Sequence, residues 1–342
     1  MISPLILVTG STGLVGSQLL LDLVRSGKQV RAMKKHTGNL SLVHQTFHRY
    51  ANNDAEALLK NIEWVEGDVL DTYSLLEAMK EVKQVYHCAA VVSFGSYFSN
   101  NLMKINVEGT ENVVNMALEA RIQKLCHISS VAALGRAKKN NLITEETHWE
   151  ISSNNSLYAV SKYGAEREVW RGIAEGLNAV IVNPSIIIGA GDWKRGSSKM
   201  FEQGWKGLKY YTEGINGFVD VRDVSSSMTK LMDSEIKNER FIISSENYSY
   251  RDFYNEVSAH FQKRKPYLKA TPFLSEIAWR LAAIKGIFTN SSPLINKETA
   301  RTANQKYFYS NEKIKKTLGI EFIPVKQSIK DTCAIFLKEV NG

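Results

Sequence analysis

Cysteine and proline are both scarce in this chain, which has three of the first and six of the second among 342 residues. Cys88, Cys126 and Cys333 form no CxxC pair and suggest no disulfide framework. Few and scattered thiols are typical of a reducing compartment, so we expect a cytoplasmic protein. We predict no metal site.

Long hydrophobic runs are missing as well. The N-terminal letters MISPLILVTG hold a short apolar run that has no basic stretch before it and leads directly into glycines. Such a segment is typical of a first buried strand rather than of a signal peptide. No stretch is long enough to cross a bilayer, so we expect a soluble protein with no membrane partner.

Charge of one sign is not concentrated in any long segment. The formal net charge is +8, but 43 Lys and Arg residues are interspersed with 35 Asp and Glu residues. Proteins that bind nucleic acid present their basic residues as a patch or a stripe. We therefore predict no nucleic-acid partner.

Apolar strand-like runs alternate with amphipathic helical segments through the first half of the chain. The runs are LILVTG, QVRAMK, IEWVEGD, QVYHCAAV and KLCHISS. Strands this apolar are buried on both faces, as in a parallel sheet that helices cover on both sides. The sequence therefore predicts a doubly wound α/β fold.

The alternation breaks after residue 189. Residues 190–216 are rich in glycine, lysine and aromatic side chains, and two strand-like runs in about 217–245 are expected to return to the core. The remainder reads as mostly helical, and its amphipathic segment 272–288 fits core or lid packing better than a membrane surface. We predict a larger domain of residues 1–183 plus about 217–245, and a smaller, mostly helical substrate domain of about 184–216 and 246–342.

Three glycines, Gly10, Gly13 and Gly16, stand where the first strand turns into the first helix. A Cβ there would block the turn or the approach of a pyrophosphate to the helix N-terminus, whose N–H groups attract phosphate. The spacing GxxGxxG is one residue wider than the usual dinucleotide fingerprint. We predict a Rossmann domain in which these glycines bind a dinucleotide together with Thr12, Leu14 and Val15.

The acidic residue that commonly holds a ribose 2′-hydroxyl is missing, since no acid occurs between Asp22 and Asp54. The second strand ends instead in Lys34 and Lys35, where a cation favours the 2′-phosphate of NADP. The two lysines are also explained as a solvated strand end. Even then, the lack of an acid argues against strict use of NAD.

Further cofactor contacts are predicted after the third and fourth strands. Asp68, followed by Val69, lies where an adenine would bind, although its carboxylate could instead cap the helix that starts near Thr72. Ala89, Ala90 and Val91 follow the fourth strand, and ligands of open α/β sheets bind beyond such strand ends.

Two Tyr–Lys pairs share a spacing of four residues: Tyr158 with Lys162, and Tyr309 with Lys313. Residues four apart on a helix point from the same face, so an ammonium can lie close to a phenol. The spacing alone does not say which pair is functional.

The order of motifs resembles the extended branch of the short-chain dehydrogenase/reductase superfamily, the NAD-dependent epimerase/dehydratase family. The motifs are TGSTGLVG, GDVLD, HCAA, NVEGT, ISSVAALG, YAVSK, NPSIIIGAGD and FVDVRDV, and they run over nearly the whole chain. Within that branch the chain looks most like the dihydroflavonol reductase and hydroxysteroid dehydrogenase group, whose members use NADP or NAD to interconvert alcohols and ketones.

The resemblance implies which residues are catalytic. Tyr158 and Lys162 stand where the family has its acid–base pair, Ser130 matches the catalytic hydroxyl, and Asn106 matches an asparagine of the proton relay or the cofactor loop. A structural hydrogen bond in a helix kink explains Asn106 equally well. Pro184 and Ser185 would lie near the nicotinamide, and a homodimer is common in the branch.

Three functions remain open on these grounds. The first is an NADP(H)-dependent oxidoreductase acting on a small carbonyl or alcohol; the second is a nucleotide-sugar epimerase or dehydratase with tightly bound NAD; the third is a non-catalytic cofactor-binding scaffold. Aromatic residues in the substrate region favour an apolar substrate for the first, although they could equally pack the smaller domain: Phe94, Trp193, Phe201, Trp205, Tyr210 and Tyr211.

Overall fold

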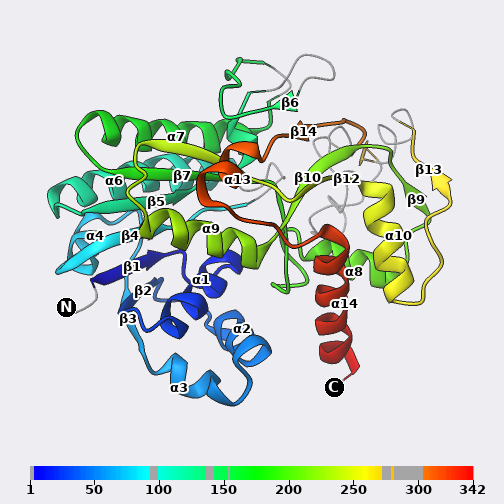
Figure 1. Cartoon of the computed structure of the whole chain (residues 1–342), viewed down its shortest axis with the longest axis horizontal. Coiled ribbons are helices and arrows are strands. Elements are labelled where there is room, and N and C mark those ends of the chain that lie inside the picture. Colours follow the sequence, from blue (N-terminus) through cyan, green and yellow to red (C-terminus); the bar gives the residue numbers. More distant parts are fainter. Residues whose placement is uncertain are drawn as a thin grey trace.

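The computed structural model describes residues 4–92, 99–135, 142–152, 155–271, 279–280 and 303–341. Phe94 and most of the segment 272–288 lie outside these residues. In the described part, a large sheet has helices on both faces, and a smaller region beside it holds the C-terminal helix (Figure 1).

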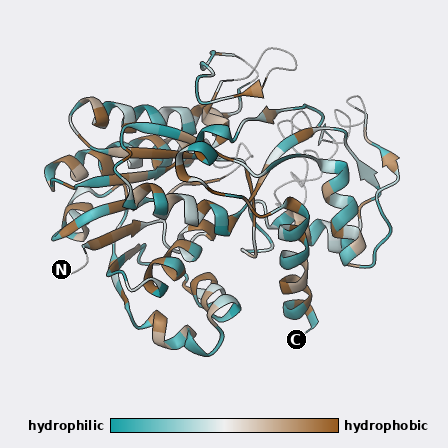
Figure 2. Ribbon diagram, in the orientation of Figure 1, coloured by the Kyte–Doolittle hydropathy of each residue, from teal (hydrophilic) through white to brown (hydrophobic). Residues whose placement is uncertain are grey.

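The large sheet has seven parallel strands in the order β11-β7-β5-β4-β1-β2-β3. They are β1 (Leu5–Thr9), β2 (Val30–Lys34), β3 (Ile62–Glu66), β4 (Val82–His87), β5 (Lys124–Ile128), β7 (Ala179–Pro184) and β11 (Glu239–Ile243). Along β1 the side chains alternate, so that Ile6 and Val8 enter one core and Leu7 the other. Much of the hydrophobic colour in Figure 2 lies on these strands. The predicted doubly wound parallel sheet is confirmed.

Helices cover both faces of this sheet. One face packs against α1 (Leu14–Arg25), α2 (Ser41–Ala51), α9 (Val221–Asp233) and α13 (Glu312–Leu318), and the other against α4 (Thr72–Ala78), α6 (Gly109–Glu119) and α7 (Leu157–Ala174). α7 begins at Leu157, after Ser156, whose hydroxyl caps the helix by accepting from the Ala159 N–H at 3.0 Å.

The strand order reverses between β1 and β4. In open parallel sheets, ligands bind at this reversal, beyond the carboxyl ends of the strands. The glycine turn after β1, the alanines after β4 and Ser130 after β5 therefore come to the same edge of the sheet.

The smaller region is built on a three-stranded sheet of β8 (Ile186–Ile188), β10 (Ile215–Asp220) and β12 (Glu246–Ser249). It packs against α8 (Lys199–Lys206), α10 (Tyr250–His260) and α14 (Val325–Asn341). We expected β10 to return to the core, and it does so on one face only, since it pairs with β8 and β12 outside the central sheet. Its side chains explain the difference, because Phe218 packs into the smaller core while Val219 packs into the larger one.

The remaining described elements are short. They are η1 (Asn52–Asp54), α3 (Ala55–Leu59), α5 (Ser99–Met103), the π-helical turn η3 (Lys104–Glu108), η4 (Val131–Ala133), and the two-residue strands β6 (Leu142–Ile143), β9 (Tyr210–Tyr211), β13 (Leu268–Lys269) and β14 (Phe308–Tyr309). Among the described residues, no helix is long and apolar enough to cross a membrane.

Aromatic side chains fill the smaller core. Phe201 is 1% exposed and contacts Phe253 edge to face, and Trp193 and Trp205 both pack against Phe336 of α14. Core packing therefore accounts for three of the aromatic residues that had suggested an apolar substrate.

Candidate active site

The glycine turn after β1 is held by close backbone contacts. Gly10 has φ of +64°, and a Cβ on it would lie 2.4 Å from the Ala89 nitrogen; a Cβ on Gly16 would lie 2.2 Å from the Gly10 oxygen. Both positions exclude a larger residue. Gly13 differs, because its φ is −86° and a Cβ there would meet only the Gly10 oxygen, at 3.4 Å.

Gly13 is therefore a test of whether the turn fits a dinucleotide. It is exposed at the N-cap of α1, a helix with no acidic residue in its first turn. Neither its backbone conformation nor its protein neighbours require glycine. Room for a phosphate beside the free N–H groups of the helix explains the missing side chain, so the turn fits a pyrophosphate.

The residues between these glycines differ in where their side chains lie. Val15 is buried in the core of the larger domain, and Leu14 packs near Gly189 and Gly191. Only backbone groups of Leu14 and Val15 therefore remain for a phosphate. Thr12 is half-buried in the turn itself.

Both lysines at the end of β2 have carboxylate partners across the sheet edge. Lys34 Nζ lies 3.2 Å from Glu66 Oε1, and Lys35 Nζ lies 2.9 Å from Asp68 Oδ2. Lys35 contributes to a lowered pKa of Asp68, against the opposing effect of burial. The pairs are partly exposed and are compatible with a solvated strand end, and these carboxylates balance much of the lysines' charge.

Asp68 does not cap the helix that follows it. The cap of α4 is Asp71, whose side chain accepts from the Tyr73 N–H, whereas Asp68 Oδ1 accepts from the Leu70 N–H at 3.1 Å. The capping alternative for Asp68 is therefore wrong, and an adenine contact stays a prediction. Val69 is 3% exposed and packs on Gly109, so its side chain belongs to the core.

Asn106 fixes the loop that follows β4. It lies in the π-helical turn η3 and is 1% exposed; its side chain accepts from the Val91 N–H at 2.7 Å and donates to the Val91 oxygen at 3.0 Å. Its amide also donates to Ser161 Oγ of α7 at 3.0 Å. These bonds join the half-buried stretch Ala89, Ala90 and Val91 to the helix that carries Tyr158. The bonds agree with a structural role for Asn106, and its part in a proton relay stays a prediction.

Tyr158 and Lys162 lie one turn apart at the start of α7. Side chains of a helix lean toward its N-terminus, so Lys162 extends toward the turn of Tyr158. Lys162 is 2% exposed, and its ammonium donates to the Ile128 oxygen at the end of β5, at 2.8 Å. Burial lowers the pKa of Lys162 to about 8, against the opposing effect of Glu166. The strand end therefore holds the ammonium in place, one helical turn from Tyr158.

The two serines after β5 have separate roles. Ser129 is buried and donates to Glu166 Oε2 at 2.7 Å, so its hydroxyl is committed to the protein. Ser130 is half-buried, and its hydroxyl accepts from the Ala132 N–H at 3.1 Å, which leaves its proton to donate. This geometry agrees with the preference for Ser130.

Glu166 is a site residue that the sequence reasoning missed. It lies one turn beyond Lys162, is 2% exposed, and accepts from Ser129, Asn183 and Arg240 at 2.7, 2.7 and 3.0 Å. Asn183 also donates to the Ser130 oxygen at 3.1 Å. The carboxylate therefore ties the carboxyl ends of β5 and β7 to Arg240 near the start of β11. An acid at i+4 from Lys162, on the buried face of α7, was the available signal.

Pro184 and Ser185 lie at the junction of the two sheets. Pro184 is the last residue of β7, and the buried Ser185 donates its N–H to the Ile243 oxygen at 3.0 Å. Both follow Asn183, whose side chain donates to the Ser130 oxygen. Pro184 and Ser185 therefore lie at the same edge of the sheet as Ser130. Contact of either residue with a nicotinamide remains a prediction.

Comparison with known proteins agrees with this arrangement. The model of the NAD dependent epimerase/dehydratase family matches residues 6–244. A Methylococcus capsulatus protein named sterol demethylase protein B is 25% identical, over 96% of this chain and 97% of the relative. A putative dihydroflavonol 4-reductase of Synechocystis is 27% identical, over 95% and 92%.

Solved structures share the whole fold. The crystal structure of gox2253 superposes with a TM-score of 0.80 and 30% identity, over 98% of this chain and 99% of that one. The NAD-bound dTDP-glucose 4,6-dehydratase DesIV from Streptomyces venezuelae gives 0.78 with 17% identity, over 98% of each chain, which shows the fold alone. This chain therefore belongs to the NAD-dependent epimerase/dehydratase family and is an NAD(P)-dependent enzyme of the extended short-chain dehydrogenase/reductase type.

Proposed function

We propose that this enzyme is an NADP(H)-dependent oxidoreductase that interconverts a carbonyl and a secondary alcohol on a small organic substrate. One observation carries the proposal: buried Lys162, one turn from Tyr158 on α7, is fixed to the end of β5, two residues before Ser130. The reductase name of the Synechocystis relative supports the same reaction class.

In the reductive direction, Tyr158 donates its proton to the carbonyl oxygen of the substrate, and in the oxidative direction it takes the proton back. A free phenol has a pKa near 10 and is a poor donor or acceptor at neutral pH. A cation about 4 Å away, at an effective dielectric near 20, favours the phenolate by up to about 4 kcal/mol. Lys162 supplies that cation. A bound nicotinamide supplies or accepts the hydride.

Ser130 completes the set. Its hydroxyl already accepts one hydrogen bond from the Ala132 N–H, which orients its proton away from that contact. The hydroxyl donates to the oxygen on which negative charge develops during reduction. Glu166 and Asn183 hold the backbone on which Ser130 stands.

The preference for NADP rests on Lys34 and Lys35. A 2′-phosphate offers these lysines charge-assisted hydrogen bonds in place of, or beside, Glu66 and Asp68. Reversing the charge in Lys34→Glu should weaken NADPH binding by about tenfold or more, because hydrogen bonds to charged groups contribute about 1.5–3 kcal/mol. NADH binding should change little.

Fluorescence titration of the purified protein with each cofactor measures this effect. Lys80→Glu is the matched control, because Lys80 is also paired with a carboxylate, Glu77, but lies away from the end of β2. Equal affinity for NADPH and NADH in the wild type would contradict the NADP preference. A screen of carbonyl compounds with the preferred cofactor then identifies a substrate.

The second candidate is a nucleotide-sugar epimerase or dehydratase with resident NAD. Pairing of both lysines with carboxylates favours it, because the charge that would select a 2′-phosphate is already partly balanced. NAD that copurifies with the protein and does not exchange with added NADPH would establish this candidate. Free exchange, with turnover of a carbonyl compound, would establish the oxidoreductase.

A further inference from the structure

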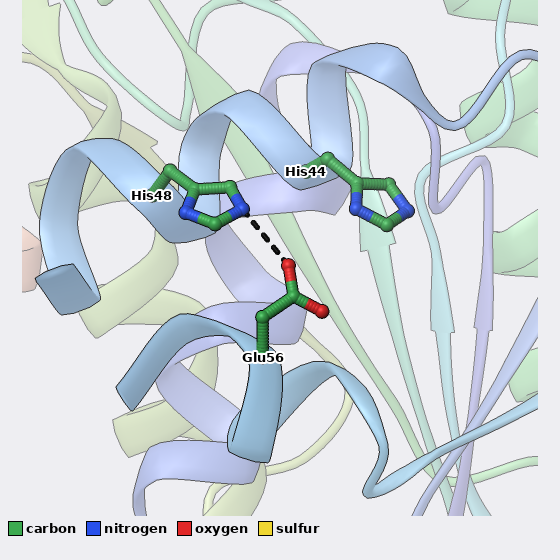
Figure 3. A group of neighbouring side chains, drawn as sticks. All are labelled: His44, His48 and Glu56. Carbon is green, nitrogen blue, oxygen red and sulfur yellow. Dashed lines mark hydrogen bonds and ion pairs between the residues drawn. The ribbon is translucent and has the colours of Figure 1, made fainter. Parts of the chain in front are cut away.

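Two histidines and a glutamate form a cluster on the surface of the larger domain, away from the glycine turn. His44 and His48 lie on α2 and Glu56 on α3, and their ligand atoms all lie within 4.8 Å of one another. Figure 3 shows both imidazoles on the side of α2 that faces Glu56. The sequence reasoning overlooked the signal, which is the HxxxH spacing in HQTFH.

The fold holds the three side chains in place from beneath. On α2, Val43 and Phe47 are fully buried, so the residues that follow each of them, His44 and His48, point outward one turn apart. The short turn η1 then brings α3 back, and Ala55 of α3 is buried in the same core. Glu56, next to that anchor, therefore faces the two histidines.

We propose that His44, His48 and Glu56 bind a divalent transition-metal ion of the zinc type. Two imidazole nitrogens and one carboxylate oxygen are a recurring zinc donor set, and two histidines at i and i+4 supply adjacent positions. His48 Nε2 is already 3.0 Å from Glu56 Oε1. Ligand atoms around tetrahedral zinc, with bonds of about 2.0–2.1 Å, stand about 3.4 Å apart, so a small rotation of exposed side chains completes the set. Water takes the fourth position.

The chemical consequence of binding is a cross-link between α2 and α3. The carboxylate offsets part of the ionic charge, and the ion replaces a single hydrogen bond between exposed side chains with three coordinate bonds. The cross-link spans the turn at Asn52. The φ of Asn52 is +47°, a backbone conformation that residues other than glycine rarely adopt. We therefore expect metal to stabilise this part of the fold, independently of cofactor and substrate.

The test uses the full chain without an affinity tag, stripped with a chelator and titrated with zinc chloride against a zinc indicator. The wild type should bind one zinc ion per chain with micromolar affinity or better, and each of His44→Ala, His48→Ala and Glu56→Gln should weaken binding by about tenfold or more. His36→Ala is the matched control, because His36 forms an exposed pair with Glu66 at 2.9 Å that gains no second histidine. It should bind zinc like the wild type.

Thermal unfolding gives a second readout, because an ion that binds only the folded chain raises its melting temperature. Zinc should raise the melting temperature of the wild type and of His36→Ala, and not that of the His44→Ala/His48→Ala double variant. Absence of zinc binding by the wild type would overturn the proposal. Binding that survives all three substitutions would overturn it as well, since the ion would then lie elsewhere.

Discussion

The two Tyr–Lys pairs have the same spacing and entirely different surroundings. Tyr158 and Lys162 share the helix α7, and Lys162 is buried against the end of β5. Tyr309 ends the strand β14, whereas Lys313 lies on the separate helix α13. Lys313 is about one-third exposed, donates to the Arg240 oxygen at 3.0 Å and pairs with Glu239 at 2.9 Å.

A spacing of four residues places a tyrosine and a lysine on the same face only where one helix contains both residues. On α7 both side chains leave the same helix one turn apart, and Lys162 is buried where its ammonium meets the end of β5. Between β14 and α13 the chain changes conformation, so the spacing has no geometric meaning. Asn247 holds the Tyr309 backbone on both sides, at 2.8 and 3.0 Å, as part of the fold.

The largest expected difference between the pairs is in turnover. Tyr158→Phe should lower kcat by about 10²- to 10⁴-fold, since a placed proton donor contributes that much. Tyr309→Phe should leave kcat unchanged. Steady-state kinetics with the preferred cofactor and the screened substrate measure both, and circular dichroism checks that both variants fold. Equal losses in the two variants would refute the assignment of the acid–base residue.

A second difference concerns how stability depends on pH. The pKa of Lys162 falls from its ordinary value of 10.5 to about 8 because burial disfavours the cation. Between these pH values the unfolded chain holds a proton that the folded chain has lost, so stability rises with pH. Over this window, the free energy of unfolding of the wild type should rise by about 1.4 kcal/mol per pH unit, compared with that of Lys162→Met. Urea unfolding of both proteins from pH 8 to 10 measures the slope; parallel curves would count against a buried, neutralising lysine.

The carboxylates beside the two lysines provide the third comparison. Glu166→Gln should lower the free energy of unfolding by about 2–3 kcal/mol, because Arg240 and the buried network would lose the charge that they pair with. It should also lower kcat more than it changes KM, since the strand end under Ser130 loosens. Glu239→Gln should lower the free energy of unfolding by less than about 0.5 kcal/mol, because it removes only an exposed ion pair. A kcat that stays at the wild-type value in folded Glu166→Gln would show that the network has no positioning role.

A small effect on stability is also expected for Lys313 itself. Its ammonium lies 4.6 Å from the centre of the Phe241 ring, in addition to its pair with Glu239. Lys313→Met keeps most of the stem packing and should cost about 0.5–1 kcal/mol, the contribution of a partly exposed cation–π contact. Chemical denaturation at neutral pH gives this value, and a loss of turnover in the same variant would be unexpected.

Local patterns were sufficient to predict the parallel sheet. Apolar runs with helical segments between them predicted the parallel sheet, and the glycines predicted a turn in which Gly10 and Gly16 have no room for a Cβ. The start of α7 at its Ser156 cap was predictable for the same reason, since capping depends on neighbouring residues. The pairing of β10 in a second sheet was not predicted, because its apolar residues pack into two cores at once, which no single periodicity reveals.

The sequence by itself determined the order of elements and the glycine turn after β1, because these depend on residues close together in the chain. It also named Ser130, Tyr158 and Lys162 as candidates. Only the tertiary structure decided which Tyr–Lys pair is buried at a strand end, and that Glu166 joins Ser129, Asn183 and Arg240 beneath Ser130. It also brought Glu56 to His44 and His48. Burial and the meeting of distant residues result from packing, and packing is a property of the whole fold.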